Sequence, residues 1–272
     1  MILIDDETSQ SATWRRRSRV DLVVGGHPVL CVLGILCVGL VGCGDSGHDQ
    51  TTQSSNDASM VGTRVAVKGQ VRGLVGTDGL AGVTICVDGS ETCVVSDDLG
   101  QYELNDVGTG RELLIRYDLA DHLGATVPHR LRPTDVDIPP VSLVADALIE
   151  TQFQILDVTR QPGKGLVVFG VSNGINGDGI NVEGATAYLV PDPGQRAYYS
   201  SAAGLPDAAL AATSTNGGGV IVNVDPGAYQ IVYQSIPDTC SMRLGWGTAD
   251  DARLIVEADR VTIIRIECVE NP

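Results

Sequence analysis

The feature that most constrains the fold of this chain is a set of short segments with a two-residue period. In one of them, Leu113, Ile115 and Tyr117 alternate with the charged residues Glu112 and Arg116. Such alternation is typical of a β-strand that has one buried and one solvated face. Clusters of Gly, Pro, Asn and Asp separate these segments. The pattern therefore predicts an all-β protein built from sandwiches of short strands.

The order of turns and strands occurs twice along the chain. The landmark glycines of the two series correspond as Gly69 and Gly170, Gly82 and Gly184, Gly100 and Gly218, and Gly110 and Gly227. The later landmarks are further apart than the earlier ones, which places an insertion at residues 191–212, between two strands of the second series. Two tandem domains explain this repetition better than one large domain. We predict one sandwich at residues 63–143 and a second, more divergent one at residues 164–270.

These landmarks resemble those of the carboxypeptidase regulatory-like domain. The motifs are Gly-Gln-Val at residues 69–71, Gly-Val-Thr-Ile at 82–85, Asp-Asp-Leu-Gly-Gln-Tyr-Glu-Leu at 97–104 and Pro-Gly-Ala-Tyr at 226–229. The resemblance covers residues 64–143 well and 165–268 more loosely, and it departs from the family pattern at residues 110–113 and 216–218. It implies two Ig-like or transthyretin-like β-sandwiches of about seven strands each. It implies no peptidase activity, because the catalytic domain of metallocarboxypeptidases, with its zinc ligands, is a separate unit.

Residues 144–163 are expected to connect the two sandwiches. Val144, Leu148 and Ile155 fall near the spacing of one helical face, which predicts a short helix in this connector. The Pro-Gly pair at residues 162–163 then marks the start of the second sandwich.

Residues 1–42 have the pattern of a lipoprotein signal peptide. Arg15, Arg16, Arg17 and Arg19 precede an apolar, uncharged run over residues 28–42. That run is shorter than the about 20 residues that a membrane-spanning helix needs. It ends in Leu-Val-Gly followed by Cys43, which resembles a bacterial lipobox, in which the cysteine becomes the acylated first residue of the mature protein. We therefore predict lipidation of Cys43.

The predicted anchor defines where the protein is located. Acyl chains on Cys43 would attach an exported protein to a membrane of the bacterial cell envelope. Gly44 is not the aspartate associated with inner-membrane retention in enteric bacteria, which favours the outer membrane. The alternatives are an ordinary secretory signal with a chance cysteine, or a single-pass anchor lengthened back to Leu22. Residues 43–62 are rich in Gly, Ser, Asp and Thr and are expected to form a flexible tether.

Four cysteines follow Cys43, and we expect them to form two disulfides in an oxidising compartment. Cys86 and Cys93 flank a turn, so a hairpin would place them directly opposite each other, within reach of a disulfide. Cys240 and Cys268 would then pair by default. No pair has the spacing Cys-x-x-Cys or a neighbouring histidine, so a zinc site is not expected.

Other residues give little sign of catalysis or of a cofactor. The net charge is -16 with only 18 Lys plus Arg, which argues against a nucleic-acid partner. The histidines after Cys43 are His48, His122 and His129, and no serine or cysteine lies in a nucleophile-elbow motif. Residues 173–183 superficially suggest a calcium loop, but EF-hand spacing fails at both ends. We expect no enzymatic activity, no metal and no cofactor.

Two hypotheses for function remain. The first is a non-enzymatic lipoprotein that acts as a structural or protein-interaction module, with an unknown envelope protein or glycan as its partner. The rival is a carbohydrate-binding surface lipoprotein, because sugar platforms are usually built from exposed aromatic residues. The candidate ligand contacts for the rival are Arg196, Tyr198 and Tyr199 in the insertion, and Trp246 between two glycines.

Overall fold

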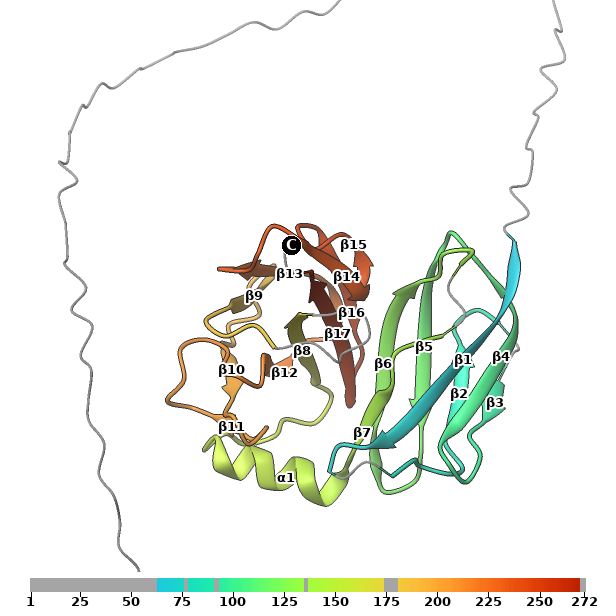
Figure 1. Ribbon diagram of the computed structural model, residues 1–272. Helices are drawn as coiled ribbons and strands as arrows, with labels where there is room; N and C mark the ends of the chain where they lie inside the picture. Colours follow the sequence, from blue (N-terminus) through green and yellow to red (C-terminus); the bar gives the residue numbers. More distant parts are fainter. Residues whose placement is uncertain (1–62, 76–77, 91–92, 135–136, 174–180, 270–272) are drawn as a thin grey trace, which may run out of the picture. The chain divides into compact units, whose positions relative to one another are not determined.

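The computed structural model describes residues 63–269, apart from 76–77, 91–92, 135–136 and 174–180 (Figure 1). The predicted signal peptide, Cys43 and the predicted tether lie outside the described residues, as does most of the segment that resembles a calcium loop. Within the described part of the chain, no helix is long and apolar enough to cross a membrane. The described residues belong to one compact unit.

Seven strands and a helix form the first half of the described chain. They are β1 (Arg64–Gly73), β2 (Thr84–Val87), β3 (Cys93–Val95), β4 (Gln101–Gly108), β5 (Glu112–Asp118), β6 (His122–Arg130), β7 (Val141–Ala145) and α1 (Asp146–Ile155). Strands β3, β2, β5 and β6 pair in that order, whereas β1 pairs with β4 and β7. This is the predicted β-sandwich, and we call it the first sandwich.

The alternating residues of the first sandwich form its core. Leu113, Ile115 and Tyr117 are all buried, and they pack against Val67 and Val71 of β1. The hydroxyls of Tyr102 and Tyr117 lie 2.8 Å apart inside this core, so neither phenol is buried without a partner. The two-residue period of the sequence thus marks the buried face correctly.

Ten strands form the second half. They are β8 (Gly165–Asn173), β9 (Thr186–Val190), β10 (Ala197–Ser200), β11 (Pro206–Asp207), β12 (Gly218–Val224), β13 (Gly227–Gln234), β14 (Cys240–Leu244), β15 (Trp246–Gly247), β16 (Ala252–Val256) and β17 (Arg260–Cys268). One layer has the order β11-β10-β12-β8-β17, with β14 also on β17, and the other has the order β15-β16-β13-β9. The two layers enclose a second core that includes Phe169, Ile221, Ile231 and Leu254. We call this the second sandwich.

The helix α1 follows the first sandwich, as the sequence predicts, but its buried face differs from the predicted one. Ile149 and Phe153 are the buried residues of α1, whereas Ile155 is exposed. Ile149 and Phe153 pack with Leu123 of β6 and Val261 of β17 in a third apolar cluster. Full burial of a side chain of this size contributes about 1.5–3 kcal/mol. The helix is thus packed against residues of both sandwiches.

The insertion at residues 191–212 is not an irregular loop. It contains β10 and β11, which pair with each other, and β10 also pairs with β12. The insertion therefore adds two strands to the edge of an existing sheet.

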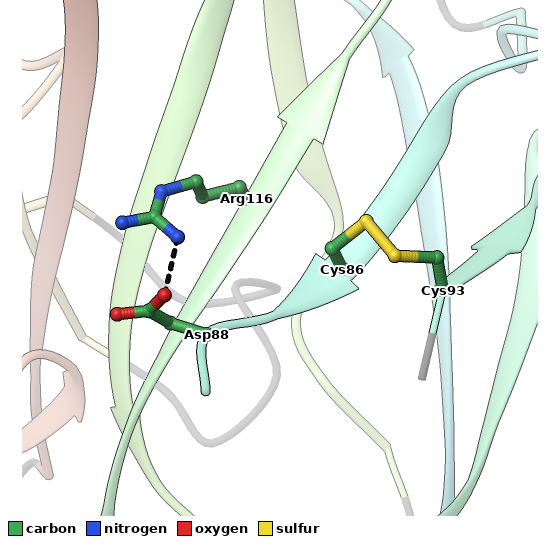
Figure 2. Close-up of a disulfide and its surroundings, with 4 residues drawn as sticks. All are labelled: Cys86, Asp88, Cys93 and Arg116. Atoms are coloured by element: carbon green, nitrogen blue, oxygen red, sulfur yellow. Dashed lines mark hydrogen bonds and ion pairs between the residues drawn. A yellow bond between two sulfur atoms is a disulfide. The ribbon is translucent and has the colours of Figure 1, made fainter. Parts of the chain in front are cut away.

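Both predicted disulfides are present. Cys86 and Cys93 are directly opposed in the hairpin of β2 and β3, as the turn between them predicts (Figure 2). Cys240 and Cys268 are directly opposed on β14 and β17. Each bridge therefore links a registered cross-strand pair within one sandwich.

Candidate functional site: the junction between the two sandwiches

The two sandwiches are joined by a pair of strands that are distant in sequence. Residues Arg260, Val261 and Thr262 of β17 pair in parallel with Gly124, Ala125 and Thr126 of β6. Further along the chain, the same edge of β17 pairs with β14. One sheet therefore runs from the first sandwich into the second, which the expectation of two tandem domains does not by itself predict. The domain bounds at 63–143 and 164–270 remain a prediction about units that could fold alone.

An ion pair crosses the junction beside these strands. Arg116 of β5 donates from Nε and Nη2 to the carboxylate of Glu257, at 3.0 and 2.6 Å. Thr126 on β6 donates its hydroxyl to the same carboxylate at 2.8 Å. The other end of the guanidinium donates to Asp88 at 2.6 Å (Figure 2). A two-pronged arginine–carboxylate contact is strong and geometrically specific.

The charges of this pair stabilise each other. Hydrogen bonds from Arg116 lower the pKa of Glu257, against the opposing effect of burial, and the bond from Thr126 lowers it further. Hydrogen bonds to Glu257 and Asp88 raise the pKa of Arg116. Both side chains are partly buried, with exposed fractions of 30% for Arg116 and 24% for Glu257, so the contact is only partly screened by water.

A second arginine reaches across the junction from the opposite direction. Arg260 donates from Nε to the Thr126 hydroxyl at 3.0 Å, from Nη1 to Asp118 at 2.6 Å and from Nη2 to the Ala125 carbonyl at 2.9 Å. Gly124 makes room for it, because a Cβ at that position would lie 2.9 Å from the guanidinium carbon. With a further bond from Nη2 to the Tyr117 carbonyl, Arg260 of the second sandwich is thus held by four acceptors of the first.

Trp246 is also a junction residue. Its indole Nε1 donates to the Leu113 carbonyl of β5 at 2.8 Å. Arg253, opposite Trp246 on β16, donates to Glu112 at 2.5 Å. Leu244 of β14 is buried within the core of the first sandwich. The indole N–H of Trp246, a predicted ligand contact, is therefore already hydrogen-bonded to the backbone of the other sandwich.

The structure brings only two of the four predicted ligand contacts together. The Arg196 guanidinium stacks over the Tyr198 ring, 4.6 Å from its centroid. Tyr199 is a correction to the prediction, because it is only 6% exposed and its hydroxyl accepts a hydrogen bond from the Ala187 amide. Consecutive residues of a strand point to opposite faces, so Tyr198 and Tyr199 on β10 cannot form one platform. Tyr198 packs instead against the cluster under α1.

The sequence did not single out the ionic residues of the junction. In the sequence, Arg116 is recognisable only as a polar position of an alternating strand. It lies 141 residues from Glu257. No local pattern encodes such a distant pair. Each of Arg116, Glu257, Thr126 and Arg260 has its partners in place, so the arrangement holds two units together and contains no evident nucleophile. Among the described residues, no group of three or more His, Cys, Asp and Glu side chains is placed to hold a metal ion.

No protein-family model matches the sequence, and no curated protein does. Among solved structures, a type II cohesin–X-dockerin complex from Acetivibrio cellulolyticus is 18% identical over 42% of this chain and 86% of that one, with a TM-score of 0.28. The shaft pilin SpaA from Lactobacillus rhamnosus GG is 12% identical over 77% of this chain and 100% of that one, with a TM-score of 0.24. The minor pilin of Streptococcus agalactiae is 9% identical over 76% and 96%, with a TM-score of 0.25. At these TM-scores the similarities assign neither a family nor a function.

Proposed function

We propose that this chain is a non-enzymatic lipoprotein of the bacterial cell envelope that serves as a structural or protein-interaction module. In this proposal it is made of tandem carboxypeptidase regulatory-like sandwiches, anchored through Cys43 and separated from the membrane by residues 43–62. The outer membrane is favoured over the inner one because of Gly44.

The junction is the observation that carries the proposal. Paired strands, the Arg116–Glu257 and Arg260–Asp118 contacts and the Trp246 hydrogen bond connect the sandwiches at several points. Multiple contacts of this kind suit a protein whose task is to hold a surface in a fixed geometry. Two disulfides support an oxidising compartment outside the cytoplasm.

Anchoring is tested by comparing two cysteine substitutions in the full chain, expressed in a bacterium that processes lipoproteins. Radioactive palmitate is expected to label the wild-type protein and the matched control Cys37→Ser, which changes a cysteine inside the predicted signal. Cys43→Ser is expected to carry no label, because the acylated thiol is removed. A wild-type protein without label, or equal labelling of both variants, would contradict the anchor.

The task itself is tested by cross-linking on intact cells. A photo-reactive residue on the exposed face of β9, at Tyr188 or Val190, is expected to capture a defined envelope protein. Glu257→Ala, which loosens the junction, is expected to reduce that cross-link, whereas the matched control Glu150→Ala should not. Equal capture in both variants would argue that the fixed geometry has no part in the interaction.

For the carbohydrate-binding alternative, the candidate ligand contacts that lie together are the stacked pair Arg196 and Tyr198. A glycan array with the full chain tests it, and the double variant Arg196→Ala/Tyr198→Ala is compared with Tyr188→Ala, which removes another exposed tyrosine. Glycan binding that is lost only in the double variant would favour this alternative. Absence of binding to any glycan favours the structural module.

A further inference from the structure

A groove of about 570 Å³ opens beside the junction. One wall is the end of β6 and the residues that follow it, and the other is β14 with Gly245, Gly247 and Thr248 after it. Among the described residues that line it, the charged or titratable ones are Arg130, Arg132, Arg243 and His129, and none is an aspartate or glutamate. In a chain with 18 Lys plus Arg and a net charge of -16, three arginines around one groove are a marked concentration of positive charge.

Arg243 is directed to the groove by an irregularity in its strand. The register between β14 and β17 shifts between Met242 and Leu244, which places Arg243 at the bulge. A bulge redirects the side chain of the extra residue. The following Gly245 has φ 141°, and a Cβ there would lie 2.4 Å from the Met242 sulfur, so the chain turns closely past its own strand. Both features shape the groove wall.

The charge of Arg243 is poorly compensated. Its nearest carboxylate is that of Glu267, at 3.7 Å from Nε, which is beyond a good hydrogen bond. The Arg243 Nε and the Glu267 Oε1 are both buried without a hydrogen-bond partner in the described part of the chain. The Arg243 side chain is only 19% exposed. A buried guanidinium nitrogen without a hydrogen bond is unfavourable, so the contact with Glu267 does not fully compensate the charge of Arg243.

The surroundings of Arg243 and Arg130 add to the positive charge. Glu112 is the cross-strand neighbour of Arg130, but its carboxylate accepts a hydrogen bond from Arg253. Burial lowers the pKa of Arg265 on the neighbouring strand β17, and the charge of Arg243 lowers it further, against the opposing effect of Glu267. The described lining of the groove thus carries three arginines and no carboxylate, on an acidic protein.

We propose that this groove binds a small organic oxyanion, with a phosphate or carboxylate group at the arginines. Arginine forks match both groups geometrically. Leu131, Pro133 and Met242 supply apolar lining for an uncharged body, and the volume falls in the range of about 300–1,000 Å³ that small organic ligands occupy. The groove shares none of the residues Arg196, Tyr198 and Tyr199, and its binding would not depend on the lipid anchor.

Three related sugars, two anionic and one neutral, test whether binding depends on the negative charge or on the sugar ring. The full chain, purified in a non-ionic detergent, is titrated with glucose 1-phosphate, glucuronate and glucose by isothermal calorimetry. At least one anionic sugar is expected to bind with a dissociation constant below about 1 mM, whereas glucose is not expected to bind. Which anion binds more tightly identifies the group that the groove prefers.

Paired substitutions locate the binding. Arg130→Gln/Arg132→Gln is expected to weaken anion binding by about tenfold or more, because two charge-assisted contacts are removed. The control Arg64→Gln/Arg160→Gln removes the same charge at two ion pairs away from the groove and should change binding by less than about twofold. Circular dichroism and the melting temperature establish that both variants fold.

A second measurement needs no variant. Raising sodium chloride from about 0.05 to about 0.5 M is expected to weaken the anion affinity of the wild-type protein several-fold. The proposal is overturned if neither anionic sugar binds, if glucose binds as tightly, if the groove variant binds as well as the control, or if salt has no effect.

Discussion

Two groups of arginines lie at the boundary between the sandwiches, and they differ in how their charge is balanced. Arg116 and Arg260 have acceptors for their guanidinium groups in Glu257, Asp118 and Thr126, at 2.6 to 3.1 Å. Arg243 has a single distant carboxylate and a buried nitrogen without a hydrogen bond in the described part of the chain. Arg116 and Arg260 thus hold the two sandwiches together. Arg243, in contrast, has a donor nitrogen without a hydrogen bond in the described part of the chain.

The balance of charge around an arginine distinguishes a structural contact from a candidate ligand contact. A charged pair whose partners are complete contributes to stability and geometry, and its loss leaves a partner unpaired. A buried charge whose partners are incomplete is unfavourable in the free protein and becomes favourable when a ligand completes it.

The largest effect is expected from the disulfide beside the groove. Cys240→Ser/Cys268→Ser opens a loop with a sequence separation of 28 residues, against 7 for Cys86→Ser/Cys93→Ser. Chain entropy gives losses of unfolding free energy of about 3.6 and about 2.4 kcal/mol. Urea unfolding of the oxidised protein and both variants measures the difference. A larger loss for the Cys86 and Cys93 pair would contradict this ranking.

The second-largest effect compares the loss of the junction ion pair with the loss of an exposed ion pair. Glu257→Ala leaves Arg116 without its two-pronged partner, so a loss of about 2–3 kcal/mol in unfolding free energy is expected, less than for a fully buried pair. Glu150→Ala removes an exposed partner of Arg160 and should lose no more than about 0.5–1 kcal/mol. Equal losses in the two variants would show that the junction pair is no stronger than a surface pair.

The carboxylates of Glu257 and Glu267 are expected to change the unfolding free energy with pH in opposite ways. Arg116 lowers the pKa of Glu257, so its stabilising contribution is present above the unfolded pKa of about 4.3 and is lost as the pH falls through the lower folded value. Burial raises the pKa of Glu267, so its unfavourable contribution is present above the folded value and is relieved as the pH falls toward about 4.3. The signs are therefore opposite.

Unfolding of two variants across the pH range measures this contrast. Glu257→Gln is expected to be less stable than the wild type at pH 7, with a difference that shrinks below about pH 4.3. Glu267→Gln is expected to be as stable as the wild type or more so at pH 7, with a difference that vanishes as the pH approaches about 4.3. A strongly destabilised Glu267→Gln at pH 7 would mean that this carboxylate is well paired.

The smallest effect is expected at the groove arginines. Arg130 is exposed and makes no ion pair in the described part of the chain, so Arg130→Gln should change the unfolding free energy by less than about 0.5 kcal/mol. Arg260→Gln, which removes contacts to Asp118 and Ala125, should destabilise clearly more. Thermal melts of both variants compare them. A destabilised Arg130→Gln would place that arginine among the residues that hold the structure.

The sequence predicts what local patterns can encode. The alternation at Leu113, Ile115 and Tyr117 marks a strand and its buried face, and the turn between Cys86 and Cys93 predicts their bridge. These features depend on residues close together in the chain. The repeated landmarks likewise predict two sandwiches, which the structure contains.

What the sequence does not predict depends on distant residues meeting. Arg116 and Glu257 pair because β6 and β17 lie side by side, and no spacing along the chain encodes that pairing. Tyr199 was expected in a loop, but the insertion forms β10, whose alternation buries it. In α1, contacts with both sandwiches decide that Ile149 and Phe153 form the buried face.

We expect the junction to make the two sandwiches behave as one unit, and Trp246 reports on it directly. In the variant Trp14→Phe, Trp246 is the only tryptophan, and its indole bonds to Leu113 across the junction. Urea unfolding of this full chain is followed by tryptophan fluorescence and by circular dichroism. One coincident transition is predicted, because separation of the sandwiches would break paired strands and ion pairs at once. A fluorescence change that is complete while the strand signal remains native would contradict the account.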